Sequence, residues 1–545
     1  MSDRVTYSVF TGTPLAPGLA EGIIHVHRTL LGPIDVAADD GGRHNVEKEF
    51  ERLDSATMKI TNDLCALAKR VETEIDARLS KVFEVHQLIA NDCSLKEELR
   101  REIVDNLVSA SSAVKTVLLR WEKRFLLMES QVARIKGDDI RDVSFRLRNA
   151  LAGITVHPLG EIPEGCILAV SRLLPSDTIF LSGRNIAAVL LEYGSIGSHA
   201  ALFAREMGMP CISGMANLQT TLRSGDCALV NADEGTVTIR PHKKQIYLFR
   251  KHVQRKTRCD TLAHIRAQDP AMTKDGIRAT VLANVGCNED TRKAMDHGAE
   301  GVGLYRMERA YLASVVPPSV DELLDEMRRT LEPAKGRIVC VRLLDVGGDK
   351  PMPFLKFMAE TNPSLGRRGI RLLREYPELL KAHLLAVLEL SRDFDVSVLV
   401  PMVALPDDVA MVKHHLTQLC SQLSITALPK LGAMIETPAA ALSAQAIAEH
   451  VDFLSFGTND LTQYAFAADR ENAAVERYFD DTSDVIFRML QIAHEDVPDV
   501  PLSICGELAG RLQHIPRLLQ CGIRTFSVAP SLVPAVKERI RAIRA

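Results

Sequence analysis

The chain has 545 residues, of which 46% are hydrophobic and 25% charged, and its formal net charge is −4. This length predicts two or three domains, and the composition excludes a disordered protein. The near balance of acidic and basic residues gives no electrostatic reason to expect nucleic acid or an anionic membrane as the main partner.

Three further features predict a cytoplasmic protein. The N-terminus has charges and turn residues where a signal peptide would have a basic start and an apolar core. No apolar stretch reaches the roughly 18 residues of a membrane-spanning helix. The 11 cysteines include no C-x-x-C pair, which favours reduced thiols and argues against a structural zinc site. We therefore expect a cytoplasmic protein without membrane insertion or a nucleic-acid partner.

The N-terminal part predicts strands followed by a helical insertion. Residues 1–28 are typical of short strands interrupted by Gly and Pro, ending in "GIIHVH". From about residue 44 to Phe83, apolar residues recur at spacings of three and four, which predicts one long amphipathic helix. We expect the helical sequence to form a subdomain over 29–148 that is inserted into an α/β unit.

Strand patterns then resume in "GCILAV", "AAVLLEYG", "PCISGM" and "CALVNADEGTVTIRP", with one helix expected over about 199–207. We expect residues 149–240 and residues 1–28 to form one small α/β domain. The charged stretch 241–268 is predicted to be a linker helix.

The remaining residues, 269–545, predict a (β/α)8 barrel. Short apolar runs end in polar or Gly-rich residues and alternate with helical sequence, as in "TVLANVG", "GVGLYRME", "IVCVRLLDVGGDK", "VSVLVPMV", "LGAMIET", "VDFLSFGTND" and "PLSICGE". These runs account for seven strands. We expect the eighth around "LGRRGIRLL", residues 365–373.

Charged residues gather where these strands end. In a (β/α)8 barrel the carboxyl ends of the strands meet at one mouth, where substrates bind. The side chains expected at this mouth are Arg306, Arg342, Asp345, Asp349, Lys350, Arg368, Glu436, Asn459, Asp460, Arg470 and Cys505. Several guanidinium groups suit a multiply charged anion, and the carboxylates of Glu436 and Asp460 suit Mg²⁺. The residues therefore predict a small phosphorylated carboxylic acid bound together with Mg²⁺.

A histidine provides the second candidate site. In "GSIGSHAALFAREMG", small residues precede His199 at the start of the predicted helix. A structural interpretation is available, in which Ser198 caps the helix and His199 is a polar surface residue. This stretch alone does not decide between that interpretation and a functional one.

The motifs of the whole chain resemble one enzyme family. "GVGLYRME", "RLLDVGGDKPMP", "NPSLGRRGIR", "AMIETPAA", "FLSFGTNDLTQYAFAADR" and "CGELAG" follow one another in the order and register of enzyme I of the bacterial sugar phosphotransferase system. "TGTPLAPGLAEG", "VFEVHQLIAND", "DDIRDVSFRL" and "LLPSDT" extend the resemblance through the N-terminal half. The chain is therefore identified as a member of the phosphoenolpyruvate–protein phosphotransferases.

The resemblance implies a function for His199. It would take the phosphoryl group from phosphoenolpyruvate (PEP), releasing pyruvate, and pass it to a histidine of the carrier protein HPr, which starts sugar uptake. A helix N-terminus is suited to this role because it keeps the imidazole neutral and stabilises the phosphorylated product. The α/β domain would swivel between the barrel and the helical subdomain, which would dock HPr, with hinges near residues 150 and 240.

The resemblance also assigns roles in the barrel. Glu436 and Asp460 would bind Mg²⁺, and Cys505 would protonate enolpyruvate at carbon. The residues that would bind the substrate are Arg306, Arg342, Arg368, Asn459, Asp460 and Arg470. The resemblance further implies a homodimer formed through the barrel. For His86, within "VFEVHQLIAND", we expect a role in an interface or in side-chain packing rather than in catalysis.

Departures from the family pattern keep alternatives open. The usual loop Gly-Gly-x-Thr-Ser-His reads Gly-Ser-Ile-Gly-Ser-His here, Met307 replaces a common threonine, and the chain ends at "VKERIRAIRA", short of the C-terminal helical segment of many relatives. A regulatory or nitrogen-type paralogue serving another HPr-like carrier is one alternative, and a PEP sensor without turnover is another. The segment before His199 contains no Gly-rich nucleotide loop, which disfavours pyruvate, phosphate dikinase and PEP synthase.

Overall fold

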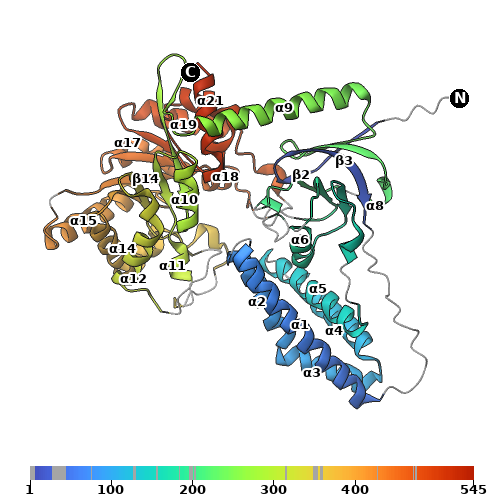
Figure 1. Cartoon of the computed structure of the whole chain (residues 1–545). Helices are drawn as coiled ribbons and strands as arrows, with labels where there is room; N and C mark the ends of the chain where they lie inside the picture. The colour runs from blue at the N-terminus through green and yellow to red at the C-terminus, as the bar shows by residue number, and fades with distance from the viewer. Residues whose placement is uncertain are drawn as a thin grey trace. The chain divides into compact units, whose positions relative to one another are not determined.

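The computed structural model describes residues 7–27, 45–74, 77–126, 131–154, 158–182, 184–194, 201, 204–205, 207–215, 217–312, 316–347, 354–355, 360–425, 427–470, 472 and 475–544. The chain divides into two compact units, residues 1–254 and 255–545. The long helix α9 (Lys243–Ile265) contains the division between them (Figure 1). No helix in the described part of the chain is long and apolar enough to cross a membrane.

In the first unit, eight strands of the described residues form one mixed sheet in the order β1-β8-β7-β3-β4-β5-β6-β2. The strands are β1 (Ser8–Thr11), β2 (Thr13–Ala16), β3 (Leu19–Val26), β4 (Ile167–Val170), β5 (Ala188–Leu191), β6 (Cys211–Ser213), β7 (Cys227–Asn231) and β8 (Thr236–Ile239). The N-terminal β3 lies between β4, which is parallel to it, and β7, which is antiparallel. The segments on either side of the helical insertion therefore share one sheet. The short helices α6 (Pro175–Ser182) and α8 (Leu218–Thr221) accompany it.

The helical part of the first unit differs from the sequence prediction. Its helices are α1 (Val46–Glu74), α2 (Ala77–Asn91), α3 (Cys93–Asn106), α4 (Ala110–Leu126) and α5 (Gln131–Leu151). The single long helix predicted up to Phe83 is wrong, because its apolar stripe is divided between α1 and α2. Leu64 and Val71 of α1 pack with Val82 and Phe83 of α2 in one buried cluster. Apolar residues recur at helical spacing in both helices, because each helix buries one apolar face. The spacing therefore does not show where the chain reverses between them.

In the second unit, eight parallel strands of the described residues close into a barrel, with β10 paired to both β11 and β17. The strands are β10 (Arg278–Val285), β11 (Gly301–Tyr305), β12 (Ile338–Arg342), β13 (Asp395–Val400), β14 (Lys430–Ile435), β15 (Phe453–Phe456), β16 (Leu502–Ile504) and β17 (Thr525–Val528). The short strand β9 (Ala271–Met272) pairs antiparallel with β10. The predicted (β/α)8 architecture is confirmed, and the chain is a multidomain α/β protein.

The helices of the second unit follow the strands in chain order. They are α10 (Asn288–Asp296), α11 (Glu308–Leu312), α12 (Val320–Leu331), α13 (Ile370–Glu375), α14 (Pro377–Leu390), α15 (Pro406–Gln422), α16 (Pro438–Leu442), α17 (Ala444–Ala448), α18 (Thr458–Phe466), α19 (Asp484–Asp496), α20 (Ile515–Gln520) and α21 (Val533–Ala542). One large apolar core joins these helices to the outer faces of the strands.

The position predicted for the eighth strand is wrong. Residues 365–373 end a short 3-10 helix, Pro363–Leu365, and begin α13, with Arg368 in one isolated bridge to Gly347. The eighth strand is β17, whose sequence "TFSV" is only four residues long and alternates polar with apolar residues. Such a short run carries little periodicity, and only its pairing with β10 and β16 makes it a barrel strand.

The barrel interior has a small apolar floor of its own. Leu304, Cys340, Leu399, Met434 and Cys505 form a buried cluster that is separate from the main core of this unit. These residues come from, or directly follow, β11, β12, β13, β14 and β16, so the cluster lies inside the ring of strands. Cys505 is the member of this floor that follows β16, and it also lines the cavity at the mouth of the barrel.

Candidate active site

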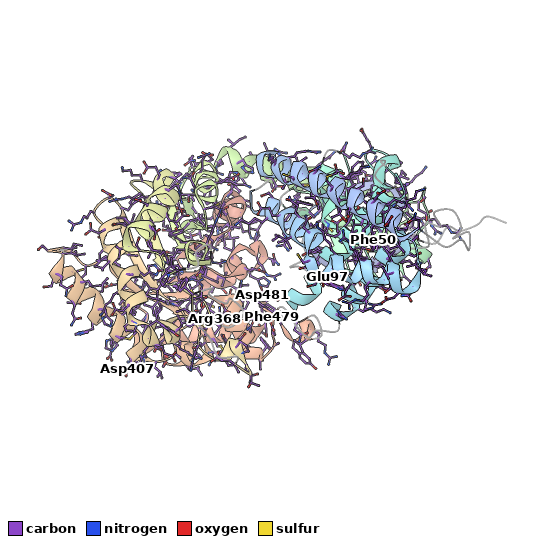
Figure 2. All side chains as sticks on the ribbon, turned by 90° about the horizontal axis from the view of Figure 1, so that it is seen from below. Phe50, Glu97, Arg368, Asp407, Phe479 and Asp481 are labelled. Carbon is purple, nitrogen blue, oxygen red and sulfur yellow. The ribbon has the colours of Figure 1, made fainter. Side chains whose placement is uncertain are left out.

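A cavity of about 260 Å³ lies at the carboxyl ends of the barrel strands. Its lining contains every barrel residue to which the family resemblance assigns a role: Arg306, Arg342, Arg368, Glu436, Asn459, Asp460, Arg470 and Cys505. Asp345, also expected at the mouth, lines it too. Arg368 is labelled among the side chains of this unit in Figure 2. His199, most of its predicted helix, Asp349 and Lys350 lie outside the described residues.

The ends of the strands explain why these side chains meet. Arg306 directly follows β11, Arg342 is the last residue of β12, and Glu436 directly follows β14. Asn459 and Asp460 lie in the first turn of α18, after β15. Parallel strands end at the same edge of a barrel, so residues far apart in sequence converge there.

A chain of buried ion pairs crosses this edge. Glu308 Oε1 is 2.6 Å from Arg342 Nη2, and Asp345 Oδ2 is 3.1 Å from Arg342 Nη1. Arg368 donates to both oxygens of Asp345, at 3.0 and 3.1 Å, and to Asp460 at 3.0 Å. Burial alone would lower the pKa of Arg342, but Glu308 and Asp345 outweigh burial and raise it. The two guanidinium groups are therefore charged and fixed in orientation.

Glu308 is a site residue that the sequence prediction missed. It begins α11, two residues after Arg306, and its carboxylate also accepts the backbone N–H of Asp345 at 3.3 Å. Its position in the first helical turn after a barrel strand is the signal that could have identified it. Nothing along the chain, however, shows that it pairs with Arg342 on the next strand.

Carboxylates are in excess beside these arginines. Glu436 is 1% exposed and accepts the backbone N–H of Met402. Burial, followed by repulsion from Asp460 and Asp345, raises the pKa of Glu436 to about 8. A cation that binds beside Glu436 would favour the ionised form of this carboxyl group and lower its pKa again.

The donor set fits Mg²⁺ that shares its ligands with a substrate. Glu436 and Asp460 are hard oxygen donors, and both face the cavity. Within the described residues no three His, Cys, Asp or Glu side chains are grouped closely enough to hold a metal ion by themselves. Mg²⁺ commonly completes its shell with substrate oxygens and water, so two protein carboxylates are sufficient.

Three donors face the cavity without strong protein partners. The guanidinium group of Arg306 makes no hydrogen bond or ion pair within the described part of the chain, and Arg470 approaches Asp460 only at 4.0 Å. Asn459 Oδ1 accepts the backbone N–H of Glu507 at 2.8 Å, which leaves the Asn459 amide N–H groups for a ligand. These groups suit the phosphate and carboxylate oxygens of a small anion.

Cys505 lies below these groups and is 4% exposed. Its backbone N–H donates to the carbonyl of Phe456 at 3.0 Å, and its Sγ lies 3.5 Å from the same oxygen. Burial raises the pKa of the Cys505 thiol to about 11, although a hydrogen bond from Ser455 and the charge of Arg306 lower it somewhat. The thiol therefore keeps its proton throughout the neutral range.

His86 lies in the helical part of the other unit. It is fully buried, with Nε2 3.0 Å from Asp139 Oδ1 and Nδ1 3.7 Å from Asp142 Oδ2. Its ring meets Phe83 edge to face, with the centroids 5.6 Å apart. Of the two roles predicted for His86, these contacts favour side-chain packing over an interface.

Comparisons with known proteins agree with this geometry. Three family models match the chain: "PEP-utilising enzyme, N-terminal" over residues 11–135, "PEP-utilising enzyme, mobile domain" over 162–235, and "PEP-utilising enzyme, PEP-binding domain" over 261–545.

Relatives match over almost the whole chain. The phosphoenolpyruvate-protein phosphotransferase of Geobacillus stearothermophilus is 32% identical over 98% of this chain and 93% of its own. The protein of the same name from Bacillus subtilis (strain 168) is 30% identical over 95% of this chain and 92% of its own. A solution structure of an Enzyme I (nEIt) protein, 22% identical, covers 45% of this chain and 99% of that chain, but its TM-score of 0.38 supports no structural argument.

Proposed function

The chain belongs to the PEP-utilising enzyme family, and we propose that it transfers the phosphoryl group of PEP to His199 and then to a histidine of an HPr-type carrier protein. The activity is that of a phosphoenolpyruvate–protein phosphotransferase. The observation that supports this most is the cavity at the barrel mouth. It combines the guanidinium group of Arg306, which has no hydrogen-bond or ion-pair partner among the described residues, with two carboxylates that suit Mg²⁺ and a buried protonated thiol.

In this proposal the barrel holds PEP by its two charged ends. Arg306 and the amide N–H groups of Asn459 supply donors that have no partner among the described residues, and Arg470 supplies donors whose contact with Asp460 is long, at 4.0 Å. Arg342 and Arg368 add positive charge in fixed positions. Fixed charges stabilise the transferring phosphoryl group without reorganising during the reaction. Glu436 and Asp460 would hold Mg²⁺, which neutralises phosphate charge when it is bound.

Two bond changes follow. The bond between phosphorus and the enol oxygen breaks as a phosphorus–nitrogen bond to His199 forms, which leaves enolpyruvate. The Cys505 thiol then gives its proton to C3 of enolpyruvate, and pyruvate forms. The proton that Cys505 loses returns from water after pyruvate leaves.

Transfer requires His199 to reach the barrel. The histidine belongs to the first unit and the cavity to the second, yet in-line transfer needs the reacting atoms within about 3–3.5 Å. We assign residues 1–28 and 149–240 to a swivelling phosphohistidine domain, 29–148 to HPr docking, 241–268 to a linker and 269–545 to PEP binding. In this proposal two copies associate through the barrel and act in the cytoplasm.

One observation supports a second candidate. The loop before His199 has Gly197 where the family usually has threonine, which removes a hydroxyl group that could orient the imidazole. A nitrogen-type or other regulatory enzyme I that serves a different HPr-like carrier would tolerate such a change.

Incubation with PEP carrying labelled phosphate tests both candidates. We expect acid-labile label on the protein only when Mg²⁺ is present, and loss of that label when the cognate HPr-like protein is added. Comparing transfer rates to each HPr-like protein of the source organism distinguishes sugar uptake from a regulatory pathway. Absence of label with Mg²⁺ and PEP would refute the proposed function.

A further inference from the structure

The backbone carbonyl of Cys505 is held by a side chain from two strands away in the barrel. Asn284 of β10 donates from Nδ2 to the Cys505 carbonyl at 3.1 Å. Cys505 directly follows β16, and β17 separates β16 from β10 in the barrel order. The amide of Asn284 thus reaches across one whole strand to meet Cys505.

The need for this contact follows from the end of the β16 ladder. The pairing of β16 with β17 stops at Ile504 and Phe526, so the carbonyl of Cys505 lies just beyond the paired residues. A backbone carbonyl that is buried without a donor costs free energy, and Asn284 supplies the donor that the ladder no longer offers. The Cys505 N–H is already bonded to Phe456 of β15. Both backbone groups of Cys505 are therefore fixed.

Asn284 is itself oriented by Ser527 of β17. The buried Ser527 hydroxyl donates to Asn284 Oδ1 at 2.6 Å. This contact makes Oδ1 the acceptor and turns the N–H groups of Asn284 towards Cys505. Three neighbouring strands, β16, β17 and β10, are thereby joined through one pair of side-chain hydrogen bonds.

Gly303 leaves the space that Ser527 needs. A Cβ added at Gly303 would lie 2.4 Å from Ser527 Oγ and 2.6 Å from Ser527 Cβ. The register of β10 and β11 also shifts at this level, since Ala283 pairs with Val302 whereas Asn284 pairs with Leu304. Such irregularities re-aim side chains near active sites, and this one lies at the level of Asn284.

We propose that Asn284 and Ser527 are positioning residues that aim the Cys505 thiol at C3 of enolpyruvate. This inference rests on the proposed function, in which the S–H bond breaks, its electron pair stays on sulfur and the proton forms the new C–H bond. One face of the planar enolpyruvate is then protonated, because the thiol approaches from one direction only. Without the hydrogen bonds of Asn284 and Ser527, the Cys505 thiol would deliver its proton more slowly and with less facial selectivity.

The test uses full-length Asn284→Ala and Ser527→Ala with stereospecifically deuterated PEP in tritiated water. Two quantities are measured: the chirality of the methyl group of pyruvate, and the rates of protein phosphorylation and of pyruvate formation. We expect Asn284→Ala to slow pyruvate formation about 10- to 100-fold, the scale of a misplacement of about 1 Å. We also expect it to lose facial selectivity, whereas protein phosphorylation changes less than about threefold. Ser527→Ala should give a smaller loss of the same kind, because Asn284 remains but can rotate.

Two controls separate positioning from a general loss of structure. Ser503→Ala removes another interior hydroxyl, one that donates to the carbonyl of Leu454 at 3.3 Å, and it should leave facial selectivity intact. In a Cys505→Ala background, Asn284→Ala should add no further loss, because residues that act through one group are non-additive. If Asn284→Ala does not fold, as judged by thermal unfolding, the result for Ser527→Ala decides whether the proposed positioning role holds.

The outcomes are distinct. Normal chirality and rate in both single variants of a folded protein would overturn the inference and leave the proposed function intact. Additive losses in the Cys505→Ala background would also overturn it. A wild-type protein that PEP does not phosphorylate would overturn both.

Discussion

Glu308 and Arg342 form a buried ion pair at the mouth of the barrel, with Glu308 Oε1 2.6 Å from Arg342 Nη2. The pair joins α11 to the end of β12, and Glu308 also accepts the N–H of Asp345. Arg342 is thus held in place before any substrate arrives, which is the arrangement that electrostatic catalysis requires.

Replacing this partner should weaken PEP binding. In Glu308→Gln the charge-assisted hydrogen bond becomes a neutral one, worth about 1–2 kcal/mol less, so we expect the KM for PEP to rise about 10-fold. Steady-state kinetics measures this change. Asp393→Asn breaks an exposed pair with Arg328 in the same unit and should leave the KM unchanged. An unchanged KM in Glu308→Gln would show that Asp345 alone orients Arg342.

His199→Ala should abolish phosphorylation of the protein and leave PEP binding nearly unchanged. The expected binding groups all line the barrel cavity, whereas His199 belongs to the other unit. Labelled phosphate measures the first property and calorimetric titration with PEP the second. Acid-labile phosphate on the variant would assign the acceptor to another residue.

Cys505→Ala should slow the formation of pyruvate by a factor on the order of 10²–10⁴, the usual scale for a lost general acid. The affinity for PEP should change far less, because the thiol lies below the ion pairs and holds none of them. Stopped-flow assays of pyruvate and equilibrium binding separate the two effects. Normal turnover with protonation of the correct face would show that another group supplies the proton.

The raised pKa of Cys505 predicts low reactivity of this thiol towards alkylation. Burial holds the pKa at about 11, so the fraction of nucleophilic thiolate at pH 7 is small. We expect iodoacetamide to modify the exposed Cys259 well before Cys505, as measured by mass spectrometry of the digested protein. Faster modification of Cys505 would contradict its burial.

His383 of α14 should make the second unit less stable in acid. Burial lowers its pKa from 6.5 to about 4, and neither ring nitrogen has a partner within the described residues. Between these pH values the unfolded chain binds the extra proton, so stability is lost as pH falls from 6.5 towards 4. At pH 5 this loss is about 2 kcal/mol.

His383→Leu should remove that acid-dependent loss. Urea unfolding of the variant should show a smaller difference between pH 8 and pH 5, while the stability at pH 8 stays equal or rises because two unpartnered nitrogens are gone. His252→Leu, on the exposed surface of α9, serves as the control. An identical pH dependence of the wild type and His383→Leu would contradict the lowered pKa of His383.

A cleavable cross-link between the phosphohistidine domain and the helical subdomain should block phosphorylation by PEP. The docking of HPr should persist, since the proposed docking helices remain accessible. Cleavage of the link should restore phosphorylation, which controls for damage by the reagent. Unimpaired phosphorylation of the linked protein would refute the swivelling domain.

Much of this site could be predicted from the sequence because it lies where strands end. Runs such as "LGAMIET" and "VDFLSFGTND" identify both a strand and the polar residues after it. When the parallel strands close into a barrel, those residues meet at one edge. Arg306, Arg342, Glu436, Asn459, Asp460 and Cys505 line the cavity for this reason. Arg368 and Arg470 also line it, but they lie outside the strands and helices. The eighth strand was placed wrongly because "TFSV" is too short for its period to be recognised.

The sequence alone was sufficient to predict seven of the eight barrel strands, the polar residues at their ends and the family. Which strand closes the barrel and which charges pair became apparent only in the folded structure. The pair of Glu308 with Arg342 and the bond from Asn284 to Cys505, 221 positions apart, depend on strand register and closure. Periodicity reports which face of an element is buried, whereas a hydrogen bond depends on distance and angle between particular atoms, and these exist only once the chain has folded.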